Sequence, residues 1–172
     1  NLVAFRHLGG VGFRDEEVVA IASAYEVEDG PDDDGEMFTR AGKASDFFPS
    51  PFPNVQAARA ANGGAAPPDL SLMTKARKSG PDYVYGLLTG YTDVPAGFKL
   101  MDGLYYNTYF PGHQIAMGPP LTDGSVEFPD GTQATVQKMS SDLVTFLAWA
   151  AEPELEARKR LGVKVLLFLL VL

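Results

Sequence analysis

Apolar residues recur at helical spacing in several separate stretches of the chain. In residues 15–26, Val18, Ala22 and Tyr25 share one face behind an acidic first turn, which predicts an amphipathic helix that begins at Asp15. The same signals predict further helices over residues 54–61, 69–77, 81–88 and 135–151, and a last helix that restarts at Pro153.

Two of these helices carry a clear signal in the first turn. Asp69 is the expected N-cap of the helix over residues 69–77, whose buried stripe is expected to consist of Leu70, Met73 and Ala76. Pro81 stands in the first turn of the next helix, where a missing amide hydrogen does no harm.

The segments between the helices are predicted to be loops, apart from one short hairpin. The loops are an acidic stretch at 26–36, an irregular one at 41–53, a run of small residues and prolines at 62–68, and a long one at 92–120. Asp123-Gly124 and Asp130-Gly131 frame the hairpin, which is expected around residues 126–128. The predicted class is therefore mainly α with a small β-hairpin.

The last eight residues, 165–172, are all apolar and follow the basic residues Arg158, Lys159 and Arg160. Eight helical residues reach about 12 Å, whereas a bilayer core measures roughly 30 Å, so this run cannot span a membrane by itself. Two interpretations stay open, a buried C-terminal helix and the first turns of a membrane anchor. The apolar character on every face favours the anchor.

Composition and charge narrow the possible functions. The 172 residues include 22 acidic and 14 basic side chains, a net charge of −8, which argues against nucleic acid as a partner and favours a basic one. The chain contains no cysteine, so thiol catalysis, disulfides and cysteine–zinc sites are excluded within these residues.

Several chemical motifs fail on inspection. Gly10-Val11-Gly12 lacks the third glycine and the strand–helix setting of a dinucleotide site, and the acidic loop lacks the first and last ligands of an EF-hand. His7 and His113 are the only histidines, too few for a histidine-rich metal site. Ser140-Ser141-Asp142 is expected to cap a helix and not to supply a nucleophile. No catalytic residue is predicted.

Met117 lies in a proline-braced loop that follows a cluster of aromatic residues. A methionine in such a setting is usually an ordinary core residue. A thioether is also a soft axial ligand for haem iron, which raises the reduction potential. Spacing alone favours the core interpretation.

Longer runs of sequence carry a family resemblance. NGGAAPPDLSLM at 62–73, KAR at 75–77, LLTGY at 87–91, YFPG at 109–112, IAM at 115–117, DGT at 130–132 and WAAEP at 149–153 occur in one order along the chain. With EDGP at 28–31 and DGEMF at 34–38, this series resembles the cytochrome c1 family, and its compact spacing resembles the mitochondrial members.

The resemblance implies a class I c-type cytochrome fold, with residues 1–152 as the haem-binding domain and 153–172 as the start of a C-terminal transmembrane helix. Members of the family hold haem c covalently through a CxxCH motif, which would lie just upstream of Arg6-His7-Leu8. The absence of cysteine is then expected, and His7 has a structural role.

The resemblance also implies a site. Met117 becomes the axial ligand of the haem iron and Arg77 reaches a haem propionate. The expected lining consists of Asn62, Ala66, Pro67, Pro68, Tyr83, Leu87, Leu88, Phe110, Ile115 and Pro120. The alternatives are a surface arginine at a helix end for Arg77 and ordinary core for the apolar lining. His113, four positions before Met117, is expected at the surface and not as a rival iron ligand.

The function implied by the resemblance is electron transfer within ubiquinol–cytochrome c reductase, the dimeric respiratory complex III. Single electrons would pass from the Rieske iron–sulfur protein to soluble cytochrome c, beside cytochrome b, a small acidic hinge-type subunit and other subunits. The setting would be the mitochondrial inner membrane, with the soluble domain facing the intermembrane space, or the periplasmic face of the membrane in a bacterium.

Two alternatives stay open at this point. The acidic residues 29–36 would attract the basic cytochrome c, contact a hinge-type subunit, or form a solvated loop. The chain as a whole would otherwise be a haem-free acidic docking or assembly protein, built on a c1-like scaffold.

Overall fold

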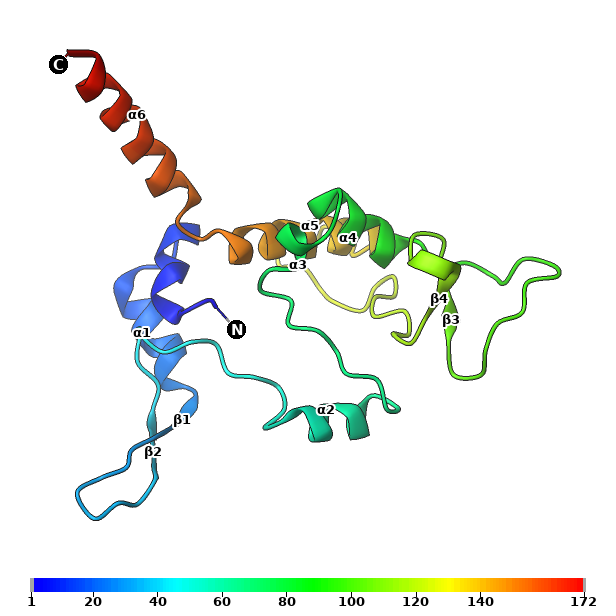
Figure 1. The fold of residues 1–172 in the computed structure, drawn as a ribbon, viewed down its shortest axis with the longest axis horizontal. Helices are drawn as coiled ribbons and strands as arrows, with labels where there is room; N and C mark the ends of the chain where they lie inside the picture. The colour runs from blue at the N-terminus through cyan, green and yellow to red at the C-terminus, as the bar shows by residue number, and fades with distance from the viewer. Residues whose placement is uncertain (1, 172) are drawn as a thin grey trace. The chain divides into compact units, whose positions relative to one another are not determined.

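The computed structural model describes residues 2–171, which are mainly helical and include two small antiparallel hairpins. Residues 2–51 and 152–171 form one compact unit, and residues 52–151 form the other (Figure 1). The mainly α class predicted from the sequence is confirmed.

The first unit contains a 3-10 helix η1 (Phe5–Val11), helix α1 (Asp15–Ser23), strands β1 (Glu26–Asp29) and β2 (Phe38–Ala41), and helix α6 (Leu155–Val171). Its centre is Phe5, which is 2% exposed and contacts the rings of Tyr25 and Phe48. His7 accepts a hydrogen bond from the main-chain N–H of Ala4 through Nδ1 at 3.1 Å. This bond supports the structural role expected for His7.

The β1–β2 hairpin corrects the prediction of a loop over residues 26–36. Glu26 pairs with Ala41 and Asp29 with Phe38, so that only the acidic tip between the strands is irregular. Arg40 on β2 donates to the carboxylate of Asp29 and, over 2.6 and 3.0 Å, to that of Asp46. Acidic residues are poor strand formers, and the ion pair with Arg40 offsets part of that cost at Asp29. The predicted helix over 15–26 accordingly ends early, at Ser23.

The apolar end of α6 is exposed from Leu161 to Val171. Within residues 2–171, no helix combines the length and the apolar character that crossing a membrane requires.

The second unit contains α2 (Val55–Ala61), α3 (Met73–Ala76), α4 (Gly80–Thr89), β3 (Tyr105–Tyr106), the 3-10 turn η2 (Pro111–His113), β4 (Gln114–Ile115) and α5 (Val136–Ala151). Helices α4 and α5 lie against each other, with α3 beside both (Figure 1). Their contact is apolar and consists of Val84, Leu88, Val144 and Leu147. Burial of these side chains supplies the main stabilisation of the unit.

The helix predicted over residues 69–77 is much shorter in the structure. The carboxylate of Asp69 accepts from the main-chain N–H of Ser71 at 2.7 Å, which makes a turn, and α3 begins only at Met73. The predicted stripe is confirmed only at Met73, which packs against the α4–α5 core. Leu70 is 48% exposed and Ala76 is exposed, and Thr74 is the buried residue of α3.

Two further expectations for this unit are wrong. Residues 126–128 form no strand, and the second hairpin instead pairs Tyr105 with Ile115. The segment Ser140-Ser141-Asp142 lies inside α5 and caps nothing. The cap comes from Thr135, whose hydroxyl oxygen accepts from the N–H of Lys138 at 3.1 Å. The helices predicted over 54–61, 81–88 and 135–151 are confirmed to within one residue at each end.

Candidate functional site

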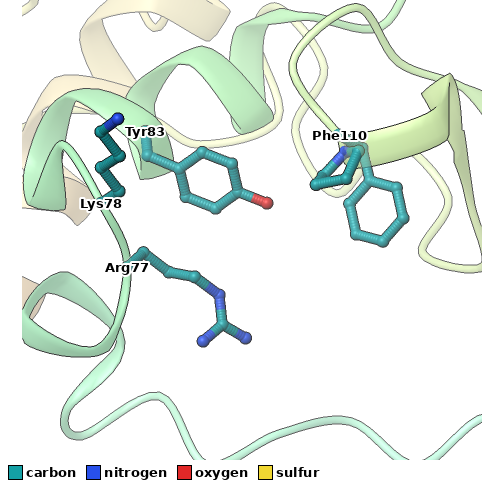
Figure 2. A pocket seen from close by; sticks show the side chains of 5 residues that line it. Arg77, Lys78, Tyr83 and Phe110 are labelled. Atoms are coloured by element: carbon teal, nitrogen blue, oxygen red, sulfur yellow. The ribbon is translucent and has the colours of Figure 1, made fainter.

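A hollow of about 380 Å³ opens beside the first turn of α4. It is lined by Arg77, Lys78, Tyr83, Phe110 and Pro111 (Figure 2). The two cations stand between α3 and α4, Tyr83 lies on α4, and the other two residues belong to η2 and its N-cap. Three residues that the sequence assigned to one site, Arg77, Tyr83 and Phe110, are therefore brought together.

The guanidinium of Arg77 has no acidic partner. Its hydrogen bond within the chain goes to the carbonyl of Ala76 at 3.3 Å, and no carboxylate in residues 2–171 forms an ion pair with Arg77 or Lys78. In Figure 2 the guanidinium points into the open side of the hollow, while the ammonium of Lys78 points away from it. Aromatic walls beside an unpaired guanidinium suit a flat apolar ligand that carries a carboxylate.

Asn107 fixes the position of Phe110 relative to α4. The Asn107 side chain is fully buried and donates through Nδ2 to the carbonyl of Leu87 over 2.8 Å. Its Oδ1 accepts from the N–H groups of Tyr109 at 3.0 Å and Phe110 at 3.2 Å. A buried amide that satisfies three main-chain groups makes this turn specific.

Met117 follows the β3–β4 hairpin, and its side chain is 39% exposed. The hydroxyl of Tyr91 donates to the main-chain carbonyl of Met117 at 2.9 Å. Burial raises the pKa of Tyr91 to about 12, so this phenol remains a hydrogen-bond donor at neutral pH. Met117 is thus an exposed residue on a segment whose carbonyl accepts a hydrogen bond.

The other predicted lining residues are distributed over the second unit. Leu88 is part of the α4–α5 core, Ile115 is buried, and Leu87 is half-buried. The remaining five are exposed, namely Asn62, Ala66, Pro67, Pro68 and Pro120. None of these eight lines the hollow beside α4, and their contact with haem stays a prediction.

His113 is exposed, as expected, and makes two contacts within the second unit. Its Nδ1 lies 3.2 Å from the carbonyl oxygen of Asn107, and its ring packs on Tyr106 with the centroids 5.7 Å apart. That His113 is not a rival iron ligand stays a prediction. Within residues 2–171, no cluster of three or more histidine, aspartate or glutamate side chains is arranged to hold a metal ion.

Sequence reasoning missed Lys78, Pro111, Tyr91 and Asn107. Lys78 and Pro111 were detectable as direct neighbours of the predicted residues Arg77 and Phe110. The contacts of Asn107 with Leu87 and of Tyr91 with Met117 join residues 20 and 26 positions apart. No local pattern marks such pairs.

A second hollow, of about 580 Å³, lies within the first unit. Its wall is formed mainly by aromatic residues and prolines, among them Phe13, Tyr25, Phe48 and Pro49. No charged side chain lines it, so it offers no counter-charge to an ionic ligand.

Comparison with known proteins decides the family. The sequence profile described as "Cytochrome C1 family" matches residues 1–172, which is the whole chain. The chain belongs to the cytochrome c1 family. The resemblance seen in the sequence is confirmed.

Individual members of the cytochrome c1 family are similar over nearly the whole chain. "Cytochrome c1-2, heme protein, mitochondrial" of Solanum tuberosum is 60% identical over 164 residues, 95% of this chain and 63% of the relative. "Cytochrome c1, heme protein, mitochondrial" of Schizosaccharomyces pombe is 56% identical over 172 residues, 100% of this chain and 56% of the relative. "Cytochrome c1" of Rhodospirillum rubrum is 51% identical over 186 residues, 99% of this chain and 68% of the relative. The chain thus spans 63% and 56% of the length of the first two relatives.

Proposed function

We propose that this chain forms the haem-binding part of the cytochrome c1 subunit of the bc1 complex, ubiquinol–cytochrome c reductase, and carries single electrons there. The family match over residues 1–172 is the observation that carries the proposal, and the similar plant and yeast proteins are named haem proteins. The enzymatic activity belongs to the whole complex, in which haem c supplies the one-electron oxidation and reduction when bound.

The residues of the hollow fit such a group. Tyr83, Phe110 and Pro111 provide apolar walls for a flat macrocycle, and the unpaired guanidinium of Arg77 is suited to a propionate. A cation beside a carboxylate of the cofactor and an apolar wall that excludes water both tune the reduction potential. The exposed residues of the 62–68 loop would complete the lining.

Met117 would supply the axial ligand. The Met117 thioether is a soft neutral donor that favours the ferrous state, and Met117 is 39% exposed and does not belong to the buried core. The cysteines and the histidine of the CxxCH motif would come from a part of the longer protein outside these 172 residues, in which no cysteine occurs.

The proposed partners and location of the chain are those of the cytochrome c1 subunit. The chain would take electrons from the Rieske iron–sulfur protein and pass them to soluble cytochrome c, in a dimeric complex with cytochrome b and the smaller subunits. Its net charge of −8 and the acidic tip between β1 and β2 suit a basic partner such as soluble cytochrome c. Residues 153–172, including the exposed apolar end of α6, would begin the anchor in the mitochondrial inner membrane, with the haem domain in the intermembrane space.

The test is a comparison of Met117→Leu with Met101→Leu in the intact protein. Met101 is a matched control because its side chain is 65% exposed and belongs to the same unit. The intact protein should show a c-type band in its reduced-minus-oxidised spectrum. M117L should lower the reduction potential and abolish the thioether-to-iron absorption of the oxidised form, and M101L should change neither.

Two results would count against the proposal. A protein without a c-type band would be the haem-free docking protein. A c-type band whose potential and thioether absorption survive in M117L would remove Met117 from the iron.

A further inference from the structure

The Tyr91 hydroxyl donates a hydrogen bond to the carbonyl of Met117, in a segment whose main chain has few such bonds. Within residues 2–171, it is the one hydrogen bond that Met117 makes, and the main chain of residues 116–121 makes no other. The preceding residue, Ile115, is buried and paired with Tyr105 in the β3–β4 hairpin. Beyond this hairpin, the Tyr91 phenol therefore supplies the one hydrogen bond that holds the Met117 main chain, while Leu121 packs against the α4–α5 core.

Tyr91 is itself attached to the C-terminal end of α4. Its main chain forms a β-bridge with Asn107, whose side chain is bound to the carbonyl of Leu87. The neighbouring residue Gly90 accepts hydrogen bonds from the N–H of Thr108 at 2.9 Å and from the Thr108 hydroxyl at 3.2 Å. The Tyr91 phenol therefore connects the segment of Met117 to a well-anchored part of the second unit.

We infer that Tyr91 is a positioning residue for Met117, which keeps the thioether where it can bind the haem iron. The inference rests on the proposed function of Met117 and adds a residue to it. Groups that orient a metal ligand from behind commonly change metal affinity when they are removed, although they do not touch the metal. Without the Tyr91 hydroxyl, the 116–121 segment loses its one main-chain hydrogen bond and the thioether spends more time off the iron.

The experiment titrates the oxidised intact protein with imidazole, which competes with the thioether, and follows the visible absorption. Tyr91→Phe removes the hydroxyl and keeps the ring. Tyr85→Phe is the matched control, because Tyr85 lies on α4 and no hydrogen bond of its hydroxyl is formed within the described residues. Y91F should need about fivefold less imidazole for half replacement, the effect of one typical hydrogen bond, and Y85F should match the wild type.

Met117→Leu separates this inference from the proposed function. If M117L loses the thioether absorption while Y91F titrates like the wild type, Tyr91 is not a positioning residue and the axial role of Met117 stands. If the absorption survives in M117L, both ideas are overturned. Loss of thermal stability in Y91F without any change in the imidazole titration would leave Tyr91 a structural role only, which also overturns the inference.

Discussion

The buried side chain of Asn107 donates a hydrogen bond of 2.8 Å to the carbonyl of Leu87, in the last turn of α4. The same amide accepts from the N–H groups of Tyr109 and Phe110. The end of α4 and the entrance to η2 are thereby joined through one side chain. Phe110 forms part of the wall beside Arg77, so Asn107 links the stability of the unit to the shape of the site.

Asn107→Ala should reduce the free energy of unfolding by about 3 kcal/mol or more. Three main-chain groups in part-buried hydrogen bonds lose their partner, and each costs about 1–3 kcal/mol where it stays away from water and unsatisfied. Chemical denaturation measures the loss. Asn62→Ala is the control, because Asn62 is exposed and donates to one carbonyl only, that of Ala58, and it should cost less than about 1 kcal/mol. Equal losses in the two variants would contradict the central role of Asn107.

Arg77→Gln should lower the reduction potential of the intact protein by roughly 20–50 mV, the effect of one partly screened positive charge near the oxidised iron. Redox titration measures the shift. Lys99→Gln is the matched control, since Lys99 is also exposed in the second unit and forms no ion pair within residues 2–171. A shift of the same size in K99Q would mean that only the overall charge of the protein matters.

Local signals in the sequence predicted the helices that position the site, but not the contacts that join them. Pro81 and the apolar spacing located α4, and the periodic stretch over residues 135–151 located α5, although its cap, Thr135, was not predicted. The Asp69 cap signal failed because the same carboxylate stabilises a turn with Ser71. One side chain serves both motifs, and the sequence does not distinguish them.

The two hairpins and the polar contacts of the site escaped prediction for a different reason. Residues 26–29 have a strongly acidic pattern, and their strand depends on Arg40, which lies eleven positions after Asp29. The two-residue strands β3 and β4 are too short for alternation to be visible. The family resemblance predicted Arg77, Tyr83 and Phe110 together, whereas periodicity alone assigned them to separate segments.

Arg40 and the two carboxylates that it contacts, Asp29 and Asp46, should make the stability of the first unit sensitive to acid. Hydrogen bonds from Arg40, and from the N–H of Lys43, lower the pKa of Asp46 from its ordinary 3.8 to about 2. The side chain of Arg40 also lowers the pKa of Asp29. Because the folded state has the lower pKa, the stabilisation is complete above the ordinary value and is lost as the pH falls through about 2.

Asp46→Asn should therefore lower the melting temperature at pH 6, and the difference from the wild type should shrink as the pH falls from 4 to 2. Thermal unfolding followed by circular dichroism at several pH values measures this. Asp33→Asn is the control, since the side chain of Asp33 has no ion pair or hydrogen bond within residues 2–171. A difference for D46N that stays constant down to pH 2 would contradict the assignment.

Ser140→Ala should stabilise the protein by about 1–2 kcal/mol. Ser140 is fully buried within α5, and its hydroxyl finds no hydrogen-bond partner among residues 2–171. Alanine removes this unsatisfied group and is also the better helix former. Ser141→Ala separates the two effects, because Ser141 is exposed in the same helix and should gain only the propensity difference of about 0.5 kcal/mol. Urea unfolding of the two variants measures the difference, and an equal gain would show that the buried hydroxyl carries no penalty.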